Sequence, residues 1–422
     1  MNTHLNGAQF GLKLLMGLQA LMWLSGCGDS DDPSTPSGQV DLEADGGGVD
    51  TDSMTMSDTG STTVDASADT QEPLPTLTVE QFSEPGPYNI GFQRHEADYT
   101  PDGQEELRTV RIVIWYPTEA QSGEPAEYAD LLPREGVFTD ARVALQSPAP
   151  VLVFTHGSTA IAEQSWFMAE YFATHGWIVV AMDHPGNTLF DNGNGVGPYV
   201  ELRPQDVRVA LDYIDTIPAA ESLSGLFSDD RLIAGHSYGG QTALVVAGAS
   251  FDISNLDVAC EAFDRDSCDL LEDAIPRLSA GYRDDRIKAV ISMTPGGYLL
   301  FRDGLTDVDI PVLLMTGARD KTLPEEEEGD PFWNAMDGPN ATRMVFLNAG
   351  HMTFSNLCEV VPGFADDDGC GDSFLPPEEA HIIINAYSMA FARAYVLGDP
   401  QAAAWLEEGF LLEGEVEVFE KR

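Results

Sequence analysis

Basic residues are scarce in this chain of 422 residues, and their scarcity excludes one class of partner. The sequence holds 21 Lys and Arg against 70 Asp and Glu, which gives a formal net charge of −49 at pH 7. Proteins that bind nucleic acid neutralise backbone phosphates with Lys and Arg. The charge balance therefore excludes nucleic acid as a partner, and it is typical of an acidic, well-solvated surface.

Cysteine is also rare, and its spacing argues against a metal site. None of the five cysteines forms a C-x-x-C pair, and no H-x-x-x-H spacing occurs, so no zinc site is predicted. The acidic runs at 325–328 and 366–368 lack the alternation of a calcium loop and are predicted to be solvated loops. We expect neither a metal nor a cofactor.

The N-terminal apolar run, residues 14–24, is too short to span a membrane comfortably. Lys13 is the only fixed charge of residues 1–27, which predict an export signal. Leu24-Ser-Gly-Cys27 resembles a bacterial lipobox, in which the cysteine is lipidated and becomes the new N-terminus. We therefore predict a cell-envelope lipoprotein, in the periplasm or on the cell surface, held to the membrane by lipid on Cys27. A plain secretory signal is the alternative.

Residues 28–80 contain no Lys or Arg and are rich in Asp, Ser, Thr, Gly and Pro. Such a segment buries too little apolar surface to offset its chain entropy, so it is predicted to be a disordered tether. Residues 81–422 form the predicted catalytic domain. Without the thirteen acids of the tether and without Lys13, 20 basic and 57 acidic residues remain, a net charge of −37, so the domain itself is acidic.

The domain alternates apolar strand-like runs with helix-like segments. This alternation predicts an α/β fold with a mostly parallel central sheet and helices on both faces. In such sheets, chemistry lies at the carboxyl ends of the strands. Expected strands are 110–116 (antiparallel), 150–155, 177–182, 287–293, 312–316 and 343–347, and expected helices are 163–175, 204–217 (with Pro204 in its first turn) and 378–396.

Gly235-His-Ser-Tyr-Gly239 fits the G-x-S-x-G pattern between an apolar run that ends at Ala234 and a helix-compatible run to Ala249. This context predicts a nucleophile elbow, a strained strand-to-helix turn with Ser237 at its apex. Gly235 and Gly239 permit the close backbone approach that such a turn needs. An ordinary glycine turn is the alternative interpretation.

A serine hydroxyl needs a base to take its proton. In the chain order of hydrolases the base follows the serine, and only His351 and His381 do so. His351 follows a predicted strand, whereas His381 lies within the last helix, so His351 is the predicted base. The predicted acid is Asp320, which follows strand 312–316. Its rivals all precede that strand: Asp303, Asp307 and Asp309.

An oxyanion needs hydrogen-bond donors. The backbone N–H of Tyr238 is the first predicted donor, and the N–H of Ser158, in the loop after strand 150–155, is the second. His156 is predicted to hold this loop. The four remaining cysteines form an even set that suggests two local disulfides in an exported chain, although three pairings are possible: Cys260, Cys268, Cys358 and Cys370.

Four segments together resemble the α/β-hydrolase superfamily: Val151-Leu-Val-Phe-Thr-His-Gly-Ser158, Ala173 to Thr188, Ala234-Gly-His-Ser-Tyr-Gly-Gly240 and Ala349-Gly-His351. Within it they resemble the predicted dienelactone hydrolases, which are similar to platelet-activating-factor acetylhydrolases and polyester hydrolases. The resemblance implies Ser237, Asp320 and His351 as nucleophile, acid and base, with Ser158 and Tyr238 as oxyanion donors. Two departures are the serine in place of the cysteine of dienelactone hydrolases, and the lack of a carboxylate in residues 294–298, where acetylhydrolases carry their acid.

These features predict a cofactor-independent serine carboxylic-ester hydrolase that forms an acyl-enzyme. Its substrate would be an extracytoplasmic ester: short-acyl, lipid-like or polyester. Residues 251–285, which follow the nucleophile helix, are expected either to cap the pocket or to form a stapled surface excursion. The alternatives are a serine peptidase and a non-catalytic surface binding protein on the same fold.

Overall fold

The computed structural model describes residues 78–192, 199–263, 269–338, 340–361, 363–410 and 414–421. The predicted signal, nearly all of the predicted tether, Cys27 and Cys268 lie outside these residues. No helix in the described part of the chain combines the length and the apolar character needed to cross a membrane.

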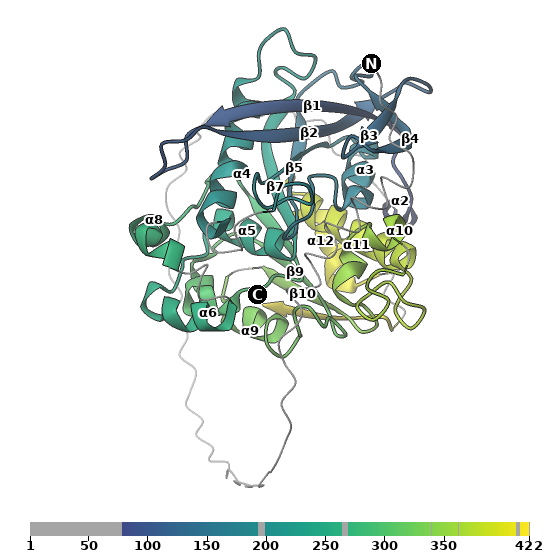
Figure 1. The fold of residues 1–422 in the computed structure, drawn as a ribbon. Helices are drawn as coiled ribbons and strands as arrows, with labels where there is room; N and C mark the ends of the chain where they lie inside the picture. The colour runs from purple at the N-terminus through teal and green to yellow at the C-terminus, as the bar shows by residue number, and fades with distance from the viewer. Residues whose placement is uncertain are drawn as a thin grey trace, which may run out of the picture.

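The described residues form one sheet of eleven strands in the order β11-β10-β9-β8-β7-β5-β6-β2-β1-β4-β3 (Figure 1). The central strands β6, β5, β7, β8, β9 and β10 are parallel, and β2 joins β6 in the antiparallel sense. The strands are β1 (Asn89–Tyr99), β2 (Arg108–Thr118), β3 (Pro125–Tyr128), β4 (Leu132–Thr139), β5 (Ala149–Thr155), β6 (Ile178–Met182), β7 (Phe227–His236), β8 (Ala289–Met293), β9 (Val312–Gly317), β10 (Ala341–Phe346) and β11 (Val416–Lys421).

Helices cover both faces of the sheet, as expected. Figure 1 shows α4, α5 and α8 on one side and α3, α11 and α12 on the other. The helices are α2 (Val79–Ser83), α3 (Trp166–Thr174), α4 (Tyr199–Thr216), α5 (Tyr238–Ala247), α6 (Leu256–Phe263), α8 (Ile275–Ala280), α9 (Gly329–Ala335), α10 (Leu357–Val360), α11 (Pro377–Tyr395) and α12 (Pro400–Glu408), with short 3₁₀ turns that include η3 (Tyr298–Leu300) and η4 (Arg302–Asp307).

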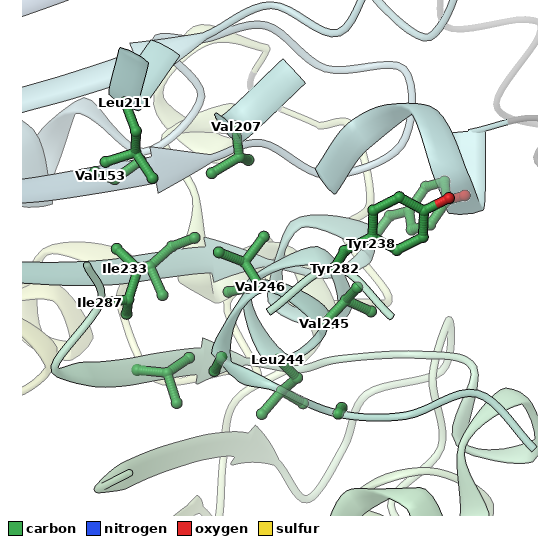
Figure 2. Packing of buried hydrophobic residues seen from close by; sticks show 14 of the residues in the cluster. Val153, Val207, Leu211, Ile233, Tyr238, Leu244, Val245, Val246, Tyr282 and Ile287 are labelled. Carbon is green, nitrogen blue, oxygen red and sulfur yellow. The ribbon is translucent and has the colours of Figure 1, made fainter. Parts of the chain in front are cut away.

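Alternate residues of the buried strands belong to two separate cores. In β5, Val151 and Val153 pack on the α4 and α5 side, whereas Leu152 and Phe154 pack on the α3 and α11 side. This follows from the two-residue period of a strand. Figure 2 shows the first core, where Ile233 of β7 lies among side chains of α4 and α5. A sheet buried on both faces holds the ends of its strands rigidly, and the site is built at those ends.

The expected strands and helices are present, and their boundaries differ most from the prediction in α4. The helix predicted to begin at Pro204 extends back to Tyr199, so Pro204 lies inside α4 rather than in its first turn. Proline lacks the N–H that would bond to the carbonyl four residues earlier, but burial of the flanking residues holds the helix across that gap. Strands β1, β3, β4 and β11, at the edges of the sheet, were not predicted.

The described part of the 251–285 segment packs beside α4. Leu271, Ala274 and Leu278 are buried in the core on the α4 and α5 side. Arg277 of α8 donates to the Glu201 carboxylate of α4 at 2.8 Å. This part of the segment is anchored on α4, and none of its described residues lines the apolar pocket described below.

Candidate active site

Ser237 lies at the apex of a tight turn between β7 and α5. Its backbone angles are φ 57° and ψ −125°, a sparsely populated conformation for a residue with a side chain. A Cβ on Gly239 would lie 1.9 Å from the carbonyl oxygen of Thr155, and one on Gly235 would lie 2.2 Å from the carbonyl oxygen of Gly239. Both glycines are therefore required by close backbone contact, as the elbow pattern predicted. Ser237 is partly exposed at this turn, directly after the end of β7.

Asp320 and His351 are joined by a short hydrogen bond. His351 Nδ1 donates to Asp320 Oδ2 at 2.7 Å, and the side chains of both residues are almost completely buried. The other oxygen, Asp320 Oδ1, accepts from the backbone N–H of Leu323 at 2.7 Å. Because Nδ1 is committed to the carboxylate, His351 Nε2 is the ring nitrogen that is left to act as a base.

The surroundings of His351 favour its protonated form. Burial acts to lower the pKa of the imidazole, but the Asp320 carboxylate and its hydrogen bond act in the opposite direction, and the charge of Asp368 adds to them. The net result is a pKa raised above that of an ordinary histidine. A base of raised pKa accepts the serine proton more readily once it is neutral.

His236 lies next to both Ser237 and His351. It directly precedes Ser237, its Nε2 contacts the His351 carbonyl oxygen at 3.0 Å, and its ring lies 4.7 Å from the His351 ring, centroid to centroid. Among the described residues, no hydrogen bond joins the Ser237 hydroxyl to His351 directly. Such contacts are often long without substrate and tighten only in the complex. The structure thus joins the side chains of Asp320 and His351 directly, whereas Ser237 is the chain neighbour of His236, which contacts the backbone of His351.

The rival candidates occupy other environments. His381 stacks on Phe167 with ring centroids 3.6 Å apart, and its Nε2 contacts the Thr353 carbonyl oxygen at 3.1 Å, so it packs behind the loop of His351. Asp309 forms an ion pair with Arg283 at 2.7 Å. Neither side chain is directed at Ser237 by any contact within the described residues.

The loop after β5 lies against the elbow. A Cβ on Gly157 would lie 3.3 Å from Ser237 Cβ. His156 Nε2 accepts the backbone N–H of His184 at 3.1 Å, so its Nδ1 carries the proton and donates to the Gly157 carbonyl oxygen at 2.6 Å. The C=O and N–H of one trans peptide point in opposite directions. Holding the Gly157 carbonyl therefore turns the N–H of Ser158 the other way.

Arg203 of α4 supports the same loop from below and is fully buried. Its guanidinium donates to the carbonyl oxygen of His156, to Thr155 Oγ1 and, at 2.7 Å, to Asn187 Oδ1. It also lies over the Tyr238 ring, 4.6 Å from its centroid. One side chain thus contacts both segments that carry the predicted oxyanion donors.

Comparisons with known proteins agree with this architecture. The profile of the alpha/beta hydrolase family matches residues 152–362, half of the chain. The chain belongs to the alpha/beta hydrolase family. A ferulic acid esterase structure from Streptomyces cinnamoneus superposes with a TM-score of 0.58 at 21% identity, over 80% of this chain and 98% of that one. A cutinase, est1 of Thermobifida alba, is 23% identical over 203 residues, which are 48% of this chain and 52% of the cutinase, so the chain spans about half the length of this curated relative.

An apolar pocket of about 140 Å³ opens beside the candidate site of this hydrolase. Its lining includes Ser158, in the loop after β5 that carries a predicted oxyanion donor, and Met352, which directly follows His351. The walls come from the β3–β4 hairpin, the loop and helix after β5, residues 189–190 and α10: Tyr128, Ala129, Leu131, Leu132, Thr159, Ala160, Ile161, Gln164, Trp166, Leu189, Phe190, Asn356, Leu357 and Val360. A largely apolar pocket with one polar corner suits a substrate with an apolar group next to its reacting bond.

One predicted disulfide is present: Cys358 bonds to Cys370. Cys260 is also disulfide-bonded, and Cys268, its predicted partner, lies outside the described residues. No group of three or more His, Cys, Asp or Glu side chains suited to hold a metal occurs within the described ranges.

The prediction of solvated acidic loops was wrong at Glu325, Glu328 and Asp368. Glu328 accepts a backbone N–H and is partly buried, and burial raises its pKa to about 7. Glu325 pairs with Arg343 and accepts from Thr316 Oγ1 at 2.8 Å, because strands β9 and β10 bring those partners to it. Asp368 is buried, with 7% of its surface exposed, because four hydrogen-bond donors surround its carboxylate. The only sequence signal near Asp368 was the pair of cysteines on either side of it.

Proposed function

We propose that this member of the alpha/beta hydrolase family is a serine carboxylic-ester hydrolase with Ser237 as nucleophile, His351 as base and Asp320 as the acid. The observation that carries the proposal is the buried Asp320–His351 hydrogen bond beside a serine on a strained strand-to-helix turn. A carboxylate that orients a neutral imidazole next to such a serine is the arrangement that activates a hydroxyl.

In the proposed reaction Ser237 Oγ attacks the ester carbonyl carbon while His351 Nε2 takes the hydroxyl proton. Asp320 stabilises the imidazolium through the Nδ1 hydrogen bond. The N–H groups of Ser158 and Tyr238 stabilise the oxyanion, and His351 then gives its proton to the leaving alcohol. Water, deprotonated by His351, attacks the acyl-enzyme and releases the acid. No cofactor takes part in these steps.

The neighbouring pocket sets the class of ester. It is about the size of a cavity that holds one benzene ring, and its walls are almost entirely apolar. We propose that it takes an apolar acyl or alcohol group of short length or of a single ring. The ferulic acid esterase and the cutinase named above support an ester as the substrate.

We further propose that the enzyme is exported and anchored to a bacterial membrane by lipid on Cys27, with residues 28–80 as a tether. The support is the sequence pattern of residues 1–27 and the acidic composition of the tether. The partners proposed are a small-molecule, lipid or polymer ester and, through the anchor, the membrane.

The test is hydrolysis of p-nitrophenyl esters from acetyl to long acyl chains by the purified chain and by Ser237→Ala. The parent should cleave the short esters, and Ser237→Ala should lose this activity, whereas Ser279→Ala, an exposed serine on α8, should keep it. A fluorophosphonate probe should label Ser237 and no other serine. Equal ester cleavage by Ser237→Ala would overturn the proposal, and faster cleavage of anilides than of esters would favour a peptidase.

A further inference from the structure

Asp368 accepts four hydrogen bonds from the two loops that carry the proposed acid and base. Its Oδ1 accepts the backbone N–H of His351 at 3.0 Å and that of Lys321 at 2.9 Å. Its Oδ2 accepts the N–H of Thr322 at 3.1 Å and the Thr322 hydroxyl at 2.7 Å. Lys321 directly follows Asp320. One carboxylate therefore bonds to the base residue and to the residue after the acid.

The backbone of Asp368 also belongs to this junction. Its carbonyl oxygen accepts the N–H of Met352 at 3.0 Å, and its own N–H donates to Ala365 at 2.9 Å. A Cβ on Gly350 would lie 2.4 Å from the Asp368 carbonyl carbon, so the base loop and the Asp368 segment touch along their backbones. The Asp368 segment is thus an integral part of the wall behind His351.

A covalent bond closes the segment that carries Asp368. The disulfide between Cys358 and Cys370 joins its two ends, and Asp368 lies two residues before Cys370. The closed loop restricts where the carboxylate can move. Without such a restraint, the segment that carries the carboxylate could move together with one loop and lose its hydrogen bonds to the other.

The other titratable groups near His351 make contacts that differ from those of Asp368. His351 faces Asp320 through its ring and Asp368 through its backbone, while His236, whose ring lies beside it at a tilt, has a pKa lowered far below its usual value by burial and is neutral. Asp367, next in the chain, is exposed and pairs with Lys321 at the surface. Within this acidic run, Asp368 is the carboxylate that contacts the base residue.

We propose that Asp368 is a positioning residue that holds the acid loop and the base loop in register, so that Asp320, His351 and Ser237 stay aligned during ester hydrolysis. This inference rests on the proposed function of the same site. Asp368 touches no substrate and exchanges no proton. Misplacement of a reacting group by about 1 Å is enough to lower a rate roughly 10²-fold.

The experiment compares Asp368→Asn with Asp366→Asn, a matched change in the same run at an exposed residue. The asparagine amide places an NH₂ group where one carboxylate oxygen accepted N–H donors. Two donors then face each other, and the hydrogen bonds that connect the two loops on that side are lost. We expect kcat on a p-nitrophenyl ester to fall roughly 10²-fold with little change in KM, and Asp366→Asn to behave as the parent.

The pH profile separates positioning from a general loss of folding. The charge of Asp368 helps to raise the pKa of His351, so its removal should move the acid limb of kcat/KM to lower pH. Partial unfolding would instead lower activity equally across the profile. Thr322→Val removes one of the four donors to Asp368. It should lower kcat measurably below that of Asp366→Asn, but less than Asp368→Asn does if that variant folds, so it keeps the test available if Asp368→Asn does not fold.

The outcomes also separate this inference from the proposed function. The positioning role is overturned if Asp368→Asn has full activity and an unmoved acid limb. If Asp368→Asn is unfolded, parental activity of Thr322→Val overturns it instead. In both cases Ser237→Ala would still be inactive. If Ser237→Ala itself keeps parental activity, the proposed function fails first.

Discussion

Two buried histidine–aspartate pairs occur in the described part of the chain, and we propose a catalytic role for only one of them. His351 Nδ1 donates to Asp320 at 2.7 Å, and His184 Nδ1 donates to Asp206 at 2.9 Å. The second ring nitrogen of His184 contacts the hydroxyl of Thr155 at the end of β5, with Oγ1 2.8 Å from Nε2. Among the described residues, no hydrogen bond to a hydroxyl occupies Nε2 of His351.

The difference lies in the charges around each pair. Arg108 binds both oxygens of Asp206 at 2.7 and 2.8 Å, and burial together with Arg203 and Arg108 lowers the pKa of His184 far below its usual value. Within the described residues no arginine pairs with Asp320, and at His351 the carboxylates raise the pKa. The same two residue types thus hold an imidazole of strongly lowered pKa in one place and an imidazole of raised pKa, the proposed base, in the other.

Removal of the base should have the largest effect. His351→Ala should lower kcat/KM on a p-nitrophenyl ester by about 10⁴-fold or more, because no other group takes the serine proton. The control is His381→Ala, which removes the other histidine that follows the serine and should keep most of the activity. Steady-state kinetics of both variants decide this, and a slower His381→Ala than His351→Ala would reverse the assignment.

Asp320→Asn should mainly lower activity, whereas Asp206→Asn should mainly lower stability. The first removes the group that fixes the tautomer of His351 and should lower kcat by about 10³ to 10⁴-fold with little change in unfolding. The second leaves Arg108 and His184 buried beside a neutral amide and should lower the free energy of unfolding by about 3 kcal/mol or more. Denaturant titration and kinetics on both variants test the pair. If both variants lost activity and stability to a similar extent, the two pairs would not differ in role.

The pH dependence of activity should follow His351. The imidazole must be neutral to act as a base, so kcat/KM should fall about tenfold per pH unit below its pKa. Because Asp320 and Asp368 raise that pKa, the fall should begin at a higher pH than for an ordinary histidine. In Asp320→Asn the residual activity should persist to lower pH. An acid limb that is the same in both proteins would contradict the link.

Thr155→Val should have the smallest effect on activity. The change removes the hydroxyl shared by His184 Nε2 and Arg203, which leaves buried groups unpaired and should cost about 1 to 3 kcal/mol of stability. The chemistry does not use this hydroxyl, so activity per folded molecule should stay within a few-fold of the parent. Thermal unfolding and kinetics measure the two effects, and an activity loss as large as that of Ser237→Ala would assign Thr155 a direct role.

Local pattern was sufficient to predict much of the fold. The elbow at Ser237, the buried strands β5 to β10 and helices α3, α5 and α11 all have apolar runs whose period is set by backbone geometry. The family resemblance was confirmed at the level of the alpha/beta hydrolase family. Strands at the edge escaped prediction because they carry exposed and half-buried residues and so lack that signal, as in β4 and β11.

The sequence by itself determined the order of the parts: a serine in an elbow, then an aspartate and a histidine, each just past a strand. Those positions follow from chain order and from the rule that parallel strands end at one edge. Only the tertiary structure decided which distant groups meet there. Arg203 beside the loop after β5, the apolar pocket, and Asp368 between Lys321 and His351 all depend on contacts between segments far apart in the chain. Such contacts leave no periodic trace in a single sequence, because the energy that fixes them comes from partners that only folding brings together.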